Sequence, residues 1–206
     1  MNDDLAFELV DLWREASKHC EHARGFDKAI EIYRYILVRY GDNNLANEYA
    51  NAHLGDILLM LGQTDLAENH IRKALSYDPQ NPQYHYLLGF IYDQRYQWEN
   101  AIQEYRLALD REPWNRGYLR ALGEVIFNSG DKKTGLEYLH EVEPFYPDNS
   151  GMLSELATAY ISLGDIESAR LYAGKAVKIG PDDIMAWAVL KKAYVLGNGT
   201  SNGATS

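Results

Sequence analysis

The chain of 206 residues has a single cysteine and no long apolar run, and each shortage excludes a class of structure. Because Cys20 has no partner within the chain, an internal disulfide and a four-cysteine metal site are both excluded. No stretch approaches the run of about 18 apolar residues that a membrane-spanning helix requires, and the first residues lack the basic start of a secretory signal. We therefore expect a cytoplasmic protein that does not bind or cross a membrane.

Basic residues are scarce as well. The 20 Lys and Arg residues face 30 Asp and Glu residues, which gives a formal net charge of −10. Nucleic-acid binding relies on clustered Lys and Arg side chains that neutralise phosphates. We therefore expect no nucleic-acid partner.

Residues that could support catalysis are also few. No glycine is followed by the Lys-Ser or Lys-Thr of a phosphate-binding loop, and the G-x-S-x-G match at 199–203 lies in the polar tail, with no apolar strand pattern before it. An enzyme hypothesis rests only on His19 and His22, which lie three residues apart and could hold a metal ion. We favour ordinary surface histidines beside a buried Cys20, and expect no catalytic residue, metal or cofactor.

What the chain does contain is a repeat of 34 residues. Self-similarity at such a period indicates stacked units, each of which buries its apolar face against its neighbours. Four of the six prolines share one register. The repeated positions are Leu54, Leu88, Leu122, Leu156 and Leu190; Gly55, Gly89, Gly123 and Ala157; and Pro79, Pro113, Pro147 and Pro181.

The unit 82–115 shows what one repeat contains. Two groups of residues at helical spacing predict two helices with a turn between them. Gly89 is small enough to let the two helices approach closely, and Pro113 ends the unit because proline is excluded from a helix interior. Gly62, Gly130 and Gly164 mark the turn in other repeats, with Tyr96 in its place here. The two helical groups are Leu88, Gly89 and Tyr92, and Ala101, Tyr105 and Ala108.

This pattern resembles the tetratricopeptide-repeat (TPR) family, whose motif runs W-x2-L-G-x2-Y, then A-x3-F, then P. His85 stands at the bulky first position. The resemblance implies an all-α solenoid of five helix-turn-helix TPR-like repeats forming a right-handed superhelix, with a C-terminal capping helix. The matching residues are His85, Leu88, Gly89, Tyr92, Ala101, Tyr105 and Pro113. The expected repeat domain, 1–196, comprises repeats 10–43, 48–81, 82–115, 116–149 and 150–183 and a capping helix 184–196, before a flexible tail 197–206.

Two departures from the repeat predict local changes. Residues 44–47 are additional, so the first helix of the second repeat should begin a turn early. Pro144 falls three residues before Pro147 and should stop or kink its helix near Val142. That change is either an early stop without consequence or a kink linked to binding.

In the family, one face of the first helices lines a concave groove that binds peptides or partner helices, so the resemblance implies a groove here. Its aromatic middle suits a partner with apolar or aromatic anchors. Tyr86, Leu87 and Phe90 fall on this face, although Tyr86 and Phe90 could instead cover each other or pack on adjoining first helices. Arg120 could anchor an anion or pair with Glu124. The candidate groove residues are Arg14, Tyr49, His53, Tyr86, Phe90, Arg120, Phe127 and Asn128.

We therefore expect a non-catalytic scaffold or adaptor that binds a partner protein as an extended peptide or as a helix. The alternative is a self-assembling structural subunit, a homo-oligomer formed through Ile184 to Leu196. That segment is largely apolar, and Lys191 and Lys192 are its only charges.

Overall fold

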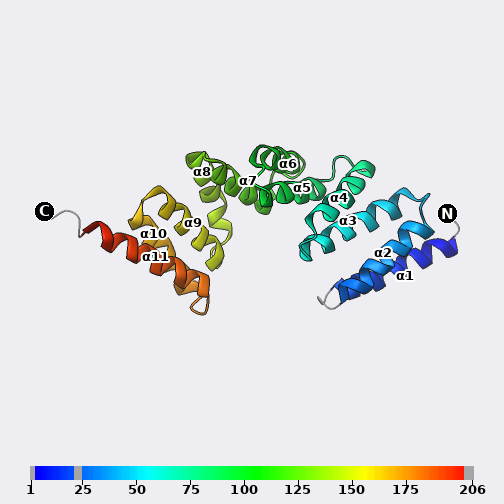
Figure 1. Ribbon diagram of the computed structural model, residues 1–206, viewed down its shortest axis with the longest axis horizontal. Helices are drawn as coiled ribbons and strands as arrows, with labels where there is room; N and C mark the ends of the chain where they lie inside the picture. The colour runs from blue at the N-terminus through cyan, green and yellow to red at the C-terminus, as the bar shows by residue number, and fades with distance from the viewer. Residues whose placement is uncertain (1–2, 21–24, 202–206) are drawn as a thin grey trace. The chain divides into compact units, whose positions relative to one another are not determined.

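The computed structural model describes residues 3–20 and 25–201 (Figure 1). Within these ranges the chain forms α-helices joined by short turns and contains no strand. The predicted all-α solenoid class is therefore confirmed. None of the helices in this part of the chain combines the length and apolar character needed to cross a membrane.

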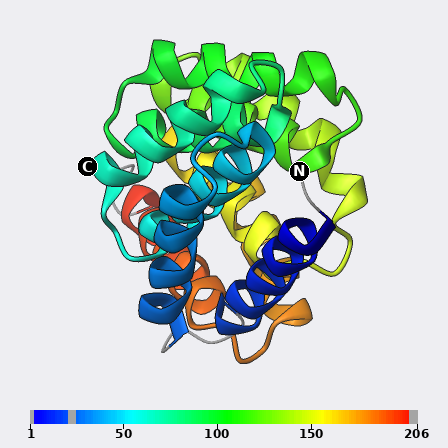
Figure 2. The ribbon, with the colours of Figure 1, turned by 90° about the vertical axis from the view of Figure 1, so that its right-hand side faces the viewer.

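The helices belong to two compact units, residues 1–113 and 114–206. In each unit, successive helices pack against one another, as α1 and α2 do side by side in two views (Figure 1, Figure 2). The first unit contains α1 (Asp3–Cys20), α2 (Phe26–Arg39), α3 (Asn44–Met60), α4 (Thr64–Tyr77), α5 (Pro82–Gln94) and α6 (Trp98–Arg111). The second contains α7 (Arg116–Ser129), α8 (Lys132–Val142), the short 3-10 helix η2 (Glu143–Phe145), α9 (Ser150–Leu163), α10 (Ile166–Ile179) and α11 (Ile184–Ser201).

Asparagine residues start the first helix of four repeats. The side chain of each accepts a hydrogen bond from a backbone N–H in the first turn of the helix, which satisfies a donor that the helix itself leaves free. Because α3 begins at Asn44, a turn before the repeat boundary at Glu48, the predicted early start is confirmed. The capping residues are Asn43, Asn81, Asn115 and Asn149.

Gly89 lies where α5 meets α6, and the space beside it is already filled. A Cβ atom at this position would lie 2.6 Å from Cδ1 of Tyr105, which is itself buried. The predicted close approach of the two helices at Gly89 is confirmed. His85, at the bulky first position of the motif, is also buried, with Nδ1 2.7 Å from Glu104 Oε2 and Nε2 3.1 Å from the Pro79 carbonyl oxygen.

Four of the turns between paired helices use left-handed backbone conformations. Gly62, Gly130 and Gly164 have φ angles of 72°, 115° and 78°. Tyr96 occupies the equivalent turn of the third repeat with φ 58°, a conformation that non-glycine residues adopt at an energetic cost. The sequence prediction of these four turns is confirmed.

Pro144 changes the end of α8 as predicted. The helix stops at Val142, and Glu143–Phe145 continue as a single 3-10 turn. Proline lacks a backbone N–H and clashes with the preceding turn, so an α-helix cannot continue through it.

The last helix is longer than the sequence indicated. It continues from Ile184 to Ser201, whereas the expected end was Leu196. The guanidinium group of Arg170 lies along the last turns of α11, and a Cβ atom at position 197 would overlap it. Glycine at this position therefore leaves room for Arg170 beside the helix. The Arg170 guanidinium carbon stands 4.7 Å from the centre of the Tyr194 ring. The remainder of the predicted tail, 202–206, lies outside the described residues.

Candidate functional site

The eight predicted groove residues divide between the two units. Arg14 lies on α1, Tyr49 and His53 on α3, and Tyr86 and Phe90 on α5, all in the first unit. The other three, Arg120, Phe127 and Asn128, lie on α7 in the second unit. Arg14 is exposed, and its guanidinium donates a hydrogen bond of 2.7 Å to Asp11 on the same helix.

Tyr49 and His53 belong to a layer of aromatic rings between α1, α2 and α3. The Tyr49 ring centre lies 4.5 Å from that of Trp13 and 4.2 Å from that of His53, and the His53 ring stacks on buried Tyr33 at 5.3 Å. Burial lowers the pKa of His53, although the nearby Asp56 carboxylate opposes this effect. Both predicted residues are half-buried and help to hold the three helices together.

Fewer side chains on the predicted groove face of α5 are exposed than the sequence indicated. Tyr86 is half-buried, and its ring centre lies 5.6 Å from that of Tyr105 on α6. Phe90 remains exposed, with 38% of its surface accessible. The placement of Leu87 on the open face was wrong, because Leu87 is buried in the helix packing.

In the second unit, Phe127 and Asn128 line a hollow of about 540 Å³. Its walls come from α7, α9 and α11, with Leu139 of α8 at its base. The hollow therefore follows the first helices of successive repeats, the elements on which the groove was predicted. The remaining lining residues are Glu124, Gly151, Ser154, Glu155, Thr158, Ala159, Ser162, Met185 and Val189.

Ten of the twelve lining residues were absent from the eight candidates, and the sequence carried a signal for at least two of them. Met185 and Val189 lie 34 residues after Gly151 and Glu155, so the repeat register places both pairs at equivalent positions. Because the sequence pattern was interpreted as a capping helix, residues of α11 were not among the candidates for the hollow. Ser154 stands at the position equivalent to Arg120, but its burial could not be read from the spacing.

Arg120 is already engaged by two carboxylates. Its Nε donates to Glu124 Oε1 at 2.8 Å and to Glu155 Oε2 at 2.9 Å, and its Nη2 donates to the other oxygen of Glu155. Pairing with Glu124, one of the two sequence-based alternatives, is therefore the arrangement found. Burial, and then the charge of Glu124, raise the pKa of Glu155 to about 7.

Ser154 contributes a polar group to the same hollow. The side chain is buried, and its Oγ has no hydrogen-bond partner among the described residues. Its backbone carbonyl accepts a hydrogen bond of 2.8 Å from Thr158 Oγ1. A buried hydroxyl without a partner is destabilising, but this Oγ is covered from solvent, so a ligand group could bond to it only if binding uncovered it.

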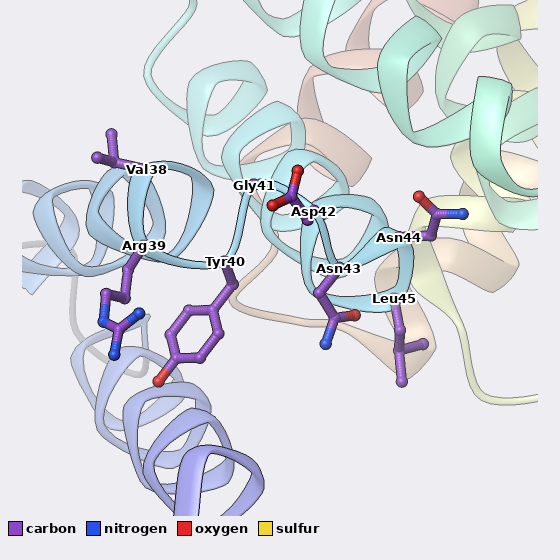
Figure 3. A pocket seen from close by; sticks show the side chains of 8 residues that line it. All are labelled: Val38, Arg39, Tyr40, Gly41, Asp42, Asn43, Asn44 and Leu45. Atoms are coloured by element: carbon purple, nitrogen blue, oxygen red, sulfur yellow. The ribbon is translucent and has the colours of Figure 1, made fainter. Parts of the chain in front are cut away.

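A second hollow, of about 710 Å³, lies at the turn between α2 and α3. It is lined by residues 38–45, a single short stretch of chain. The side chains of Val38 and Asp42 point away from those of Arg39 and Tyr40 (Figure 3). Because these groups do not converge, this hollow is a weaker candidate than the one in the second unit.

The histidine pair considered for metal binding falls partly outside the described residues, since His22 is not among them. In the part of the chain that the structure describes, no group of three or more His, Cys, Asp or Glu side chains is arranged to hold a metal ion. Cys20 is half-buried, and burial followed by the charge of Asp56 raises the pKa of its thiol. A raised thiol pKa disfavours the reactive thiolate.

Comparison with known proteins identifies the repeats. The family model described as "TPR repeat" matches residues 55–95, and the model described as "Tetratricopeptide repeat" matches residues 151–183. Among solved structures, the MamA protein aligns with a TM-score of 0.66 at 19% identity, over 83% of this chain and 91% of that one. YrrB, described as a TPR protein with an unusual peptide-binding site, aligns with a TM-score of 0.65 at 18% identity, over 87% and 97% of the two chains. Residues 55–95 and 151–183 are therefore tetratricopeptide repeats, and the solved structures share the fold of the chain.

Curated relatives are much longer than this chain. It is 30% identical over 112 residues to bacteriophage adsorption protein A of Escherichia coli (strain K12), covering 54% of this chain and 11% of that protein. It is 28% identical over 202 residues to the CTR9 homolog of Arabidopsis thaliana, covering 93% of this chain and 17% of that protein. The chain thus spans less than a fifth of either relative.

Proposed function

We propose that this chain is a non-catalytic scaffold that binds another protein, and that the hollow on α7, α9 and α11 receives the partner. The hollow supports this proposal because its accessible surface is mostly apolar and six of its twelve lining residues add polar groups, a combination common in binding sites. Similarity in fold to YrrB, whose description names a peptide-binding site, agrees with it. A peptide or a helix with apolar anchors would suit this surface.

The test uses two pairs of substitutions on the same helix. Met185→Ser with Val189→Ser removes apolar groups from the hollow, whereas Ile184→Ser with Val195→Ser changes exposed side chains outside it. The full chain and both variants are used to capture proteins from an extract of the source cells. Binding in the hollow predicts that the captured partner is lost with the first variant and kept with the second, while both melting temperatures stay close to that of the parent.

Equal capture by the Met185→Ser, Val189→Ser variant and the parent chain would contradict the assignment of the site. So would the absence of any protein captured above the level of a bait-free column. If the partner were lost only with the Ile184→Ser, Val195→Ser variant, the binding surface would be the exposed side of α11 and not the hollow.

A second candidate function is self-assembly through α11. Its support is the exposure of large apolar side chains on that helix, including Ile184 at 82% and Val195 at 62%. Apolar surface of this kind is common at sites of protein association. Light scattering on the parent chain and on the Ile184→Ser, Val195→Ser variant tests it. A mass greater than one chain that falls with the variant supports self-assembly, and a single-chain mass for the parent contradicts it.

A further inference from the structure

We propose that the hollow of the second unit selects a peptide segment in which an apolar side chain lies next to a lysine or an arginine. This inference rests on the proposed function, because it names the chemistry of the partner at the same site. Two features of the described residues carry it: an apolar seat and an excess of negative charge at one end.

The apolar seat has a buried base and an accessible edge. Leu139 and Ala159 are almost fully buried beneath it, while Met185 is 68% exposed at its edge. Phe127 and Val189, both half-buried, line the walls. A side chain entering from solvent would cover apolar surface that is otherwise in contact with water, which favours an apolar group.

Negative charge is in excess at one end of the hollow. Glu124 and Glu155 both line it, and both bond to the single guanidinium of Arg120. An ionised carboxylate offers about four acceptor positions, so above the Glu155 pKa of about 7 the two carboxylates retain capacity that one arginine does not fill. A lysine or arginine of the partner would supply the missing donors and charge.

The other nearby cation lies away from this acidic end. Lys132 donates from Nζ to the carbonyl oxygen of Ser162 at 3.0 Å and stands 6.0 Å from the centre of the Phe127 ring. Ser162 is two helical turns beyond Glu155 along α9, a distance of about 10 Å. The ammonium group of Lys132 therefore does not neutralise the acidic pair, and an acidic partner segment would meet two carboxylates.

The buried hydroxyl lies beside the acidic pair. Ser154 immediately precedes Glu155 on α9, lines the same hollow, and has an Oγ without a partner among the described residues. A hydroxyl can donate to a carbonyl or accept from an N–H, but Ser154 Oγ is covered from solvent, so a backbone group of a peptide could bond to it only if binding uncovered it.

The experiment selects random short peptides, displayed on phage, against the full chain. We expect enrichment of sequences that carry an apolar residue within two positions of a lysine or an arginine. An enriched peptide is then synthesised with blocked ends, so that its own termini carry no charge, and its affinity is measured by fluorescence anisotropy.

Matched variants distinguish the two parts of the site. Removing both carboxylates, as Glu124→Gln with Glu155→Gln, should weaken peptide binding by about tenfold, because both side chains are about one-third exposed and a cation of the peptide would lose partly desolvated partners. Glu137→Gln, an exposed carboxylate on α8 outside the hollow, should change the affinity by less than about twofold. The Met185→Ser, Val189→Ser variant keeps the acidic pair and should also weaken binding, which covers the case in which the carboxylate variant is unstable.

Two outcomes would contradict the selection by charge but not the proposed binding in the hollow. The first is enrichment of peptides rich in aspartate or glutamate. The second is enrichment of apolar peptides whose affinity is unchanged when both carboxylates are removed but falls with Met185→Ser and Val189→Ser. Peptides that bind every variant equally, or no enrichment at all, would contradict both this inference and the proposed function.

Discussion

At the scale of single residues, the turn residue Tyr96 tests how much local strain the repeat tolerates. It has a φ angle of 58° where the other turns have glycine, and its ring packs edge-on against Trp98 with ring centres 5.2 Å apart. We compare Tyr96→Gly with Tyr96→Ala, since both remove the ring. The glycine variant should have the higher free energy of unfolding by about 1 kcal/mol, because only alanine retains a Cβ that disfavours this conformation.

Urea denaturation of the two variants measures that difference directly. Equal stabilities would show that the turn imposes no left-handed requirement at position 96.

Glu155 makes a residue-scale prediction about pH. Its pKa is raised from the usual 4.5 to about 7 by burial and by Glu124, with Arg120 acting in the opposite direction. Between these values the folded chain binds more protons at this position than the unfolded chain does. The contribution of Glu155 to the free energy of unfolding should therefore fall as the pH rises through this window.

Glu155→Gln removes this titration while keeping a side chain of the same shape. Urea denaturation across the window should show a smaller loss of stability with rising pH for the variant than for the parent chain. The same pH dependence in both would refute the assignment of the titration to Glu155. Glu137→Gln, which changes an exposed carboxylate on α8, serves as the control.

At the scale of secondary-structure elements, the contact between α5 and α6 depends on Gly89. A Cβ atom there would meet the Tyr105 ring at 2.6 Å, so a larger side chain must displace a buried aromatic group. Gly89→Leu should lower the free energy of unfolding by roughly 1 to 3 kcal/mol or more through overpacking. Chemical denaturation monitored by circular dichroism measures this loss.

Gly174, within α10, provides the matched control. A Cβ atom at this position meets no other atom within 4 Å. Gly174→Leu should therefore be neutral or stabilising, because leucine favours a helix more than glycine does. If Gly89→Leu proved as harmless as Gly174→Leu, the close packing of α5 on α6 would be disproved.

Much at this scale could be predicted from the sequence, because the repeat places the same residue types at the same points of each helix pair. The turns, the stop at Val142 before Pro144, and the small residue at Gly89 all depend on chain geometry within one repeat. The length of α11 could not be predicted in this way, because its last turns contact Arg170 of α10, 27 residues before Gly197 in the sequence.

The candidate site was less predictable because it depends on contacts between repeats. Spacing on one helix placed Tyr49 and His53 on an open face, but Trp13 and Tyr33 from other helices pack on them. The link from Arg120 to Glu155 joins residues 35 positions apart, and no pattern within one helix predicts it. Phe127 and Asn128 lie at the hollow because their face of α7 meets α9 and α11, as the repeat register implied.

At the scale of the whole molecule, the proposed binding site belongs to the second unit of a repeat protein. The hollow on α7, α9 and α11 combines an apolar seat with carboxylates at one end, and this combination distinguishes it from the open turn between α2 and α3. Neighbouring positions on α11 allow a direct test, since Met185 lines the hollow and Ile184, 82% exposed, does not.

The most direct measurement is the rate at which a maleimide labels a cysteine placed at each position, in a background in which Cys20 is replaced by serine. Met185→Cys and Ile184→Cys are labelled with and without the partner captured by the full chain. Binding in the hollow predicts that the partner slows labelling at position 185 and leaves the rate at position 184 unchanged. Equal rates with and without the partner at position 185 would contradict the account.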